Sequence, residues 1–368
     1  EYIMKQLAGF TKGMGIGGWL TNYKRLNVLP EKWRLVVTEG DLEHFRTYIT
    51  EWDADNIAAM GVDHVRIGFD QLVMEEAPYQ YRTECFDLLK KFVIRCLQNG
   101  LRVVLNLHKA IGNYCDIDEP IQLLDSEALQ NRFIQLWLKF EEEYTEFPEV
   151  MFELLNEVKG VPSEKWNQLA QKTICEIRKK NPDRYIIVGS RYWNSPMHLC
   201  DLQVSADSHI IYTFHCYTPF EFTHQQGVLQ APCMYYNRKM PYPCDDITRY
   251  RDYYRLTTDN RQEAYPQYER IDIHMLRDNL CGAKSFLEKH PDKLLWCGEF
   301  GVIRHADLAS RENWMADMIR LCHELDIPYC VWNYLSTPND GNRFSLVDDQ
   351  TRQLLSPRMR EIINGENL

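Results

Sequence analysis

The 368-residue chain lacks several patterns that would assign it to a class at once. It has no run of eighteen or more apolar residues, so no transmembrane helix is expected. It has no basic patch or basic tail, and its net charge of −11 argues against nucleic acid as a partner. No signal peptide is visible, and no membrane association is expected. These absences leave a globular protein with neutral or cationic partners.

The twelve cysteines do not follow the regular spacings of a disulfide framework. Most lie in apolar segments, as Cys96 and Cys297 do, which is typical of buried free thiols in a reducing compartment. A cytoplasmic location is therefore expected, although secretion stays open because the chain begins at Glu1 and an earlier segment could have been trimmed. Cys233 and Cys244, with His224 nearby, lack the C-x-x-C spacing of a zinc site, so no metal is expected.

Other familiar catalytic motifs are also missing. The glycine-rich stretch Gly13–Leu20 has no Walker lysine and no ribose-binding acid after it, so it is interpreted as a first strand whose glycines let the backbone pass close to a ligand. Trp19 within it would form either a pocket wall or part of the core. No serine or cysteine sits in a nucleophile elbow, and no histidine pair shows metal-binding spacing.

What is present is a regular alternation of apolar strands with amphipathic helices. The pattern predicts an α/β fold, a parallel (β/α)8 TIM barrel that forms one catalytic domain over residues 1–368. Residues 219–290 interrupt the spacing and predict an inserted cap or subdomain between strands six and seven, although an oligomer contact or surface decoration would fit the same stretch. The predicted strands are 13–20, 62–69, 101–107, 151–157, 185–190, 210–215, 294–299 and 329–334, and the predicted helices are 50–60, 83–99, 126–144, 163–180, 310–325 and 357–363.

Polar side chains gather where the predicted strands end, which is where α/β barrels place catalytic groups. Asn156 and Glu157 end one apolar strand, and Glu299 ends another, so the two carboxylates are expected to face each other across one pocket. An arginine inside an apolar strand, such as Arg66, needs an acid as a partner. The whole candidate set is Arg66, His108, Asn156, Glu157, His215, Tyr217, Glu299 and Trp332.

This set of side chains fits glycoside hydrolysis best, because paired carboxylates let one acid protonate the leaving oxygen while the other attacks or activates water. Two histidines and two glutamates would also suit a metallohydrolase, which remains an alternative. A non-catalytic carbohydrate-binding scaffold is a third hypothesis, and it leaves the pair of glutamates without a chemical purpose.

The chain resembles glycoside hydrolase family 5, the cellulase family, over essentially its whole length. The motifs that carry the resemblance are Gly13–Trp19, Leu155-Asn156-Glu157, His215-Cys216-Tyr217, Cys297–Gly301 and Trp332. Residues Phe220–Gln225 and the long insertion resemble the compact cellulase/lichenase type, which has a helical subdomain after the sixth strand. The resemblance implies a retaining β-glycosidase that needs no cofactor and cleaves β-1,4-linked glucan or gluco-oligosaccharides.

The resemblance also implies the roles of individual residues. Glu157 would be the general acid/base, and Glu299 the nucleophile, kept ionised and oriented by Arg66 and Tyr217. Asn156 would bind the 2-hydroxyl of the sugar, and His215 would set the protonation of Glu157. The two remaining candidates would contact the sugar directly, Trp332 as the floor of the −1 subsite and His108 through hydroxyls.

Two departures from the family pattern put the precise sugar in doubt. Relatives often carry Asn where Gly15 stands, and Asp-x-His-His where this chain has Asn106-Leu107-His108-Lys109. The alternative function is an exo-acting β-glucosidase or β-mannosidase, because the cysteine usage favours a cytoplasmic enzyme, which would meet imported oligosaccharides instead of polymer. Further aromatic platforms for sugar rings are expected among Trp33, Tyr192, Trp193, Phe220 and Tyr236, any of which would equally serve as core.

Overall fold

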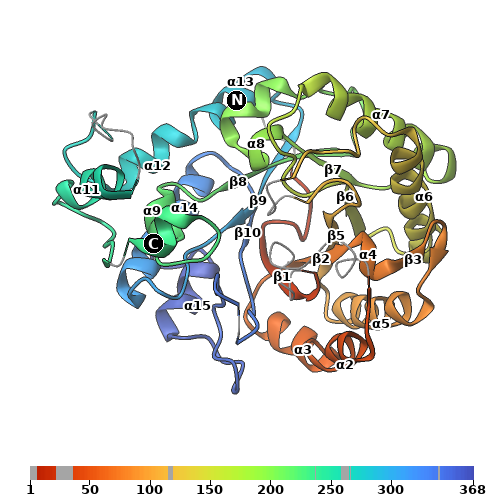
Figure 1. The fold of residues 1–368 in the computed structure, drawn as a ribbon, viewed down its shortest axis with the longest axis horizontal. Helices are drawn as coiled ribbons and strands as arrows, with labels where there is room; N and C mark the ends of the chain where they lie inside the picture. The colour runs from red at the N-terminus through yellow and green to blue at the C-terminus, as the bar shows by residue number, and fades with distance from the viewer. Residues whose placement is uncertain are drawn as a thin grey trace.

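The computed structural model describes residues 6–21, 36–114, 119–236, 238–257, 265, 267–338 and 340–368. Eight parallel strands form a closed barrel in the order β1-β10-β9-β8-β7-β6-β5-β2, and helices surround it (Figure 1). The barrel strands are β1 (Lys12–Leu20), β2 (His64–Asp70), β5 (Arg102–Lys109), β6 (Val150–Glu153), β7 (Ile186–Gly189), β8 (Ile210–Cys216), β9 (Leu294–Phe300) and β10 (Tyr329–Val331). The predicted (β/α)8 barrel is confirmed, with a last strand that ends before Trp332.

All six predicted helices are present, with small shifts at their ends. Helix α3 begins after Thr50, whose backbone N–H donates to the Asp53 carboxylate at 2.8 Å, and it is followed by Gly61 at φ +95°. Helix α2 and the hairpin of β3 (Glu75–Ala77) and β4 (Gln80–Tyr81) were not expected from the sequence. The helices are α2 (Glu39–Thr47), α3 (Glu51–Ala59), α4 (Gln71–Met74), α5 (Thr83–Gln98), α6 (Glu127–Tyr144), α7 (Ser163–Lys180), α8 (Arg191–Asn194), the 3-10 helix η2 (Pro196–Asp201), α9 (Phe220–Thr223), α10 (Ala231–Tyr235), α11 (Thr248–Thr257), α12 (Ile273–Asn279), α13 (Cys281–Lys289), α14 (Leu308–Glu324) and α15 (Pro357–Ile363).

The hydrophobic core has two parts. A large outer cluster packs the helices against the barrel, and it includes Trp19, which is 1% exposed and donates its indole N–H to the Phe45 carbonyl oxygen at 2.7 Å. A smaller cluster fills the barrel interior with one side chain from each of several strands, namely Val104, Met151, Ile187, Ile211, Trp296 and Cys330. Because this apolar layer closes the lower barrel, polar groups are left to the carboxyl ends of the strands. Trp19 is therefore core and not a pocket wall.

A register shift between β8 and β9 decides where Glu299 points. Phe214 pairs with Cys297, but the next residue, His215, pairs with Glu299, so one extra residue is accommodated in β9. Trp296 faces the barrel interior and Cys297 belongs to the outer cluster, so strict alternation would turn Glu299 outward as well. The irregularity re-aims the carboxylate into the barrel, as β-bulges beside active sites do.

Helices α9 to α13 lie between β8 and β9, and α11 and α12 project from one side of the barrel (Figure 1). The first part of this segment packs near the carboxyl ends of the strands, where the rings of His224 and Tyr217 lie 5.1 Å apart. Helix α13 instead lies against the barrel, with Phe286 packed on Tyr212 of β8. The role of residues 219–290 as a cap stays a prediction.

The eleven cysteines in the described residues are free thiols, and eight of them are buried. This agrees with the expectation of buried thiols, with Cys175, Cys200 and Cys281 as exposed exceptions. In the described part of the chain, no helix is both long and apolar enough to span a bilayer.

Candidate active site

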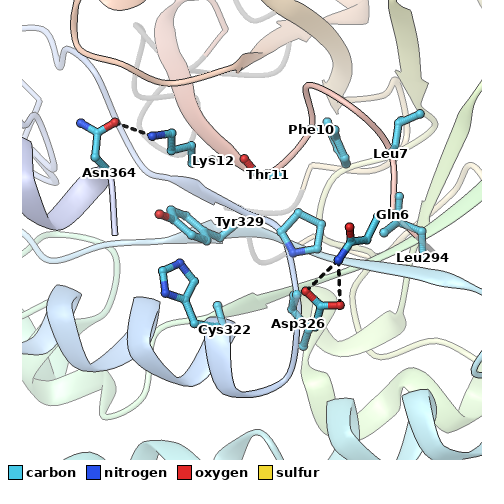
Figure 2. A pocket seen from close by; sticks show the side chains of 13 residues that line it. Gln6, Leu7, Phe10, Thr11, Lys12, Leu294, Cys322, Asp326, Tyr329 and Asn364 are labelled. Atoms are coloured by element: carbon cyan, nitrogen blue, oxygen red, sulfur yellow. Dashed lines mark hydrogen bonds between the residues drawn. The ribbon is translucent and has the colours of Figure 1, made fainter. Parts of the chain in front are cut away.

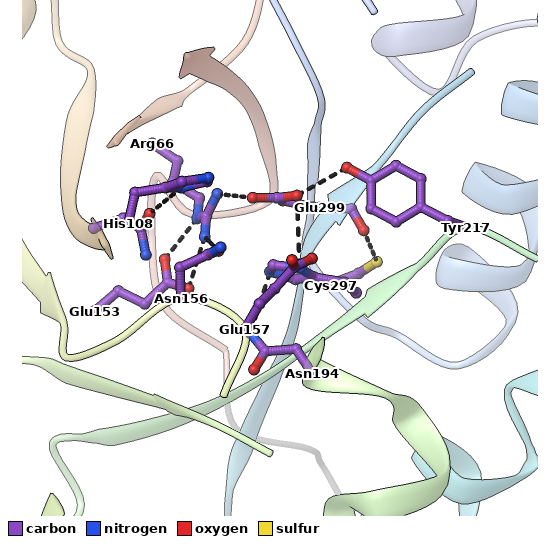
Figure 3. A network of polar contacts seen from close by, with 11 residues as sticks. Arg66, His108, Glu153, Asn156, Glu157, Asn194, Tyr217, Cys297 and Glu299 are labelled. Atoms are coloured by element: carbon purple, nitrogen blue, oxygen red, sulfur yellow. Dashed lines mark hydrogen bonds and ion pairs between the residues drawn. The ribbon is translucent and has the colours of Figure 1, made fainter. Parts of the chain in front are cut away.

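Arg66 on β2 is the centre of a buried polar network at the carboxyl ends of the strands (Figure 3). Its Nε and Nη2 donate to the two carboxylate oxygens of Glu153 at 2.6 and 2.9 Å, and its Nη1 donates to Glu299. Nη2 also donates to Asn156 Oδ1 at 2.8 Å, which orients the amide of that residue. Burial by itself lowers the pKa of Arg66, but the carboxylates of Glu153 and Glu299 outweigh it and raise the pKa. Arg66 is thus a permanent cation shared by two acids.

Tyr217 completes the surroundings of Glu299. Its hydroxyl donates to Glu299 Oε2 at 2.8 Å, so each carboxylate oxygen has a donor. Burial, together with the charges of Glu299 and Glu157, raises the pKa of Tyr217 well above its usual value. The phenol therefore keeps its proton and remains a donor, and Glu299 is 4% exposed and held in one orientation.

Glu157 follows the strand β6 in a left-handed backbone conformation, with φ +43°. Non-glycine residues adopt this region at a cost in strain, which is frequent at functional sites. His215 on β8 places Nδ1 2.9 Å from Glu157 Oε1 and 3.5 Å from Glu299 Oε2. One carboxylate oxygen of Glu157 and one of Glu299 lie within 4.8 Å of each other. Burial lowers the pKa of His215 to about 4, so its imidazole is neutral at neutral pH.

Trp332 and His108 form an aromatic pair beside this network. Their rings stack at 5.6 Å with an interplanar angle of 10°, and Trp332 also lies 6.0 Å from the Arg66 guanidinium. The strand β1 makes room for the indole with glycines, because a Cβ on Gly15 or Gly17 would come within 2.8 or 2.6 Å of its ring. The close approach that the glycines permit in this structure is thus to Trp332. Burial, followed by the charges of Lys109 and Arg66, lowers the pKa of His108 well below its usual value.

The structure therefore brings all eight predicted residues to one end of the barrel. Two further members of the network were not predicted. Glu153 is a fully buried acid within an apolar strand, and it could have been found in the sequence as a partner for Arg66, because a buried arginine needs an acid. Asn194, whose Nδ2 lies 3.2 Å from His215 Nε2, gave no signal in the sequence because nothing relates residues 194 and 215 before the chain folds.

The five aromatic candidates for sugar platforms have different fates. Tyr192 and Trp193 follow β7 and are 41% and 47% exposed. Phe220 stacks on His224 with ring centroids 3.9 Å apart, and Tyr236 is buried in the insertion. Trp33 lies outside the described residues.

A metal would find its ligands at this site in Glu157, His215 and Glu299, whose nearest atoms lie within 4.8 Å of one another. Both oxygens of Glu299 already accept hydrogen bonds, one from the cationic Arg66 and one from Tyr217. A metal cation would have to displace these donors and sit beside a guanidinium, so the residues fit a metal poorly.

A cavity of about 330 Å³ lies at the opposite end of the barrel, where β1, β9 and β10 begin (Figure 2). Four of its polar side chains pair with one another, Lys12 Nζ with Asn364 Oδ1 at 2.7 Å and Gln6 Nε2 with Asp326 Oδ2 at 3.0 Å. None of the eight candidate residues lines this cavity. Polar groups at the amino end of a barrel usually serve stability, so the candidate active site is the network around Arg66.

The fold and the site together define a (β/α)8 glycoside hydrolase with paired carboxylates. The family model described as Cellulase (glycosyl hydrolase family 5) matches residues 30–337. The chain belongs to glycosyl hydrolase family 5.

Relatives and solved structures agree with this assignment. The chain is 33% identical to Endoglucanase C of Acetivibrio thermocellus over 334 residues, which cover 89% of this chain and 92% of that protein. It is 29% identical to Cellodextrinase A of Ruminococcus flavefaciens over 315 residues, 84% of this chain and 80% of the relative. The crystal structure of endoglucanase Cel5A from Thermotoga maritima matches with a TM-score of 0.72 and 25% identity over 96% of both chains.

Proposed function

We propose that this protein is a retaining, endo-acting β-1,4-glucanase with Glu157 as general acid/base and Glu299 as nucleophile. The observation that carries the proposal is the distance within 4.8 Å between a carboxylate oxygen of Glu157 and one of Glu299. Retaining glycosidases hold their carboxyl groups about 5–5.5 Å apart, whereas inverting enzymes need about 6.5–9.5 Å to admit a water. The short separation supports direct attack by one carboxylate on the sugar.

In the first step Glu299 attacks the anomeric carbon and forms a glycosyl ester, while Glu157 gives its proton to the departing oxygen. The two environments suit these roles. Glu299 is 4% exposed and accepts hydrogen bonds from Arg66 and Tyr217, which keep it ionised and aimed. The side chain of Glu157 is 21% exposed, and the neighbouring His215 is neutral.

In the second step ionised Glu157 takes a proton from water, whose oxygen attacks the anomeric carbon and releases Glu299. The other predicted residues bind the sugar. Arg66 holds Asn156 Oδ1, which turns the Nδ2 donor of that amide toward the place of the 2-hydroxyl. The half-buried indole of Trp332 offers an apolar face for the sugar ring, and His108 lies beside it to bind hydroxyls.

The family and the names of its relatives support the substrate. A cellulase model matches most of the chain, and a relative that is 33% identical over 334 residues is named an endoglucanase. A β-1,4-glucan cleaved internally is therefore the proposed substrate, in preference to the exo-acting glucosidase or mannosidase.

The test is digestion of cellopentaose, mixed-linkage glucan and mannopentaose by the wild type and by Glu157→Gln and Glu299→Gln. Short oligomers from the glucans, lost in both variants and kept in the surface variant Glu176→Gln, are the expected result. The product formed first should carry the β configuration, as seen by proton NMR during the reaction. Release of glucose alone, or full activity of Glu299→Gln, would refute the proposal.

A further inference from the structure

Asn194 is a buried amide that the mechanism above does not use. It is 0% exposed and closes the short segment α8, which follows β7. Tyr192, Trp193 and Asn194 have φ values of +53°, +56° and +56°, so three successive residues are in the left-handed region. A run of strained residues persists only where the surrounding structure holds it. Here the Trp193 N–H donates to the carbonyl oxygen of Val158, the residue after Glu157, at 2.9 Å.

The amide of Asn194 is aimed at His215. Its Nδ2 lies 3.2 Å from His215 Nε2, and the other ring nitrogen, Nδ1, lies 2.9 Å from Glu157 Oε1. Gly189 on β7 leaves the space for this amide, because a Cβ there would come within 2.4 Å of Asn194 Oδ1. Asn194, His215 and Glu157 therefore form a row that leads from the segment after β7 to the general acid. Figure 3 shows Asn194 and Glu157, the two ends of this row.

The row has only one consistent pattern of protons when Glu157 is ionised. A neutral imidazole has one N–H and one acceptor nitrogen. If His215 accepted at Nδ1, its lone pair would face the acceptor oxygen of the Glu157 carboxylate at 2.9 Å, which is repulsive. With the proton on Nδ1 instead, Nε2 is the acceptor, and the Nδ2 donor of Asn194 matches it.

We propose that Asn194 is a positioning residue that holds His215 in its Nδ1–H tautomer and so controls where the proton of Glu157 can lie. This inference rests on the proposed function of Glu157 as general acid/base. In the first step a histidine that already carries Nδ1–H cannot accept the proton of Glu157, which is left for the leaving oxygen. In the second step the same N–H donates to the Glu157 carboxylate that acts as base.

Other charged groups face His215 and must be considered with Asn194. Glu299 from β9 lies 3.5 Å from Nδ1, and Arg66 from β2 and Glu153 from β6 act on the ring over a longer distance. The carboxylates of Glu157 and Glu299 both lie on the Nδ1 side of the ring and favour a proton there. Among the described residues, Asn194 is the hydrogen-bond partner of Nε2, and its N–H donor supports the same tautomer from the other side of the ring.

The first test measures the position of the His215 proton directly and does not depend on enzymatic activity. In protein labelled with 15N-histidine, the nitrogen shifts of His215, assigned by comparison with His215→Gln, should show a protonated Nδ1 and an unprotonated Nε2 near neutral pH. A proton on Nε2 of the wild-type protein would overturn the inference. It would leave the proposed function intact, because hydrolysis and its loss in Glu157→Gln are measured separately.

The second test uses Asn194→Gly, which removes the amide and relaxes the left-handed backbone, so folding should be kept. Loss of the Nδ1–H donor disfavours ionised Glu157, so the basic limb of the kcat/KM profile on an aryl β-cellobioside should move up by about one pH unit. Gly189→Ala should shift the limb in the same direction, because its Cβ displaces the amide while Asn194 remains. If Asn194→Gly keeps both the wild-type tautomer and the wild-type profile, the amide has only a structural role and the inference is wrong.

Discussion

Replacing Glu153 with Gln tests the buried network in a single step. The side chains of Glu153 and Arg66 are both 0% exposed, and the pair is closed by two hydrogen bonds of 2.6 and 2.9 Å. Gln keeps the size of the side chain and removes its charge. Its amide N–H₂ also faces a guanidinium N–H, so one acceptor is replaced by a donor.

The expected loss of stability in Glu153→Gln follows from the burial of the ion pair. Removing one partner of a buried ion pair costs about 3–5 kcal/mol, because the remaining charge stays in a medium of low dielectric constant. Arg66 still has Glu299 and Asn156 as partners, so we expect a loss at the lower end, about 3 kcal/mol of unfolding free energy.

The measurement is urea unfolding of the wild type and Glu153→Gln at pH 7. The dependence of the unfolding free energy on urea concentration should be the same in both, which would show that their unfolded states are alike. Glu176→Gln is the matched control, because Lys179 Nζ also lies 2.6 Å from Glu176 Oε1 but the two side chains are 66% and 39% exposed. We expect the control to lose less than about 1 kcal/mol. Equal losses in the two variants would show that burial does not govern the strength of the Arg66 network.

Three further predictions concern the candidate active site. Tyr217→Phe removes the hydroxyl that donates to Glu299 at 2.8 Å, so kcat/KM on cellopentaose should fall roughly 10- to 100-fold without unfolding, and an unchanged value would remove Tyr217 from the proposal. Gly15→Asn places a Cβ 2.8 Å from the ring of Trp332, the proposed sugar platform, so steady-state kinetics should show an increased KM for cellopentaose. An unchanged KM would mean that the indole can move aside. The pKa of His215 falls from 6.5 to about 4 on folding, so between these pH values the unfolded chain binds more protons and the free energy of unfolding drops as the pH falls. Urea unfolding at pH 7 and pH 4.5 should therefore show a smaller drop in His215→Gln than in the wild type.

Much of the architecture and of the site followed from local patterns in the sequence. The period of the apolar residues predicted the barrel, and the caps at Thr50 and Gly61 placed a helix, because both signals act over a few neighbouring residues. The polar residues that end the strands were found by the same logic, since the carboxyl ends of parallel strands must meet at one edge. The pairing of Arg66 with acids followed from the cost of a buried unpaired charge.

The tertiary structure decided the features that depend on registers and on contacts between distant segments. Alternation along β9 alone would turn Glu299 away from the barrel interior, and only the shifted pairing with β8 directs it to the site. The short distance between Glu157 and Glu299 depends both on that register shift and on the left-handed backbone conformation at residue 157. By itself, then, the sequence determined which chemical groups the protein carries and which strands end in them. Their distances and proton positions were decided by the packing of separate strands, which local patterns do not encode.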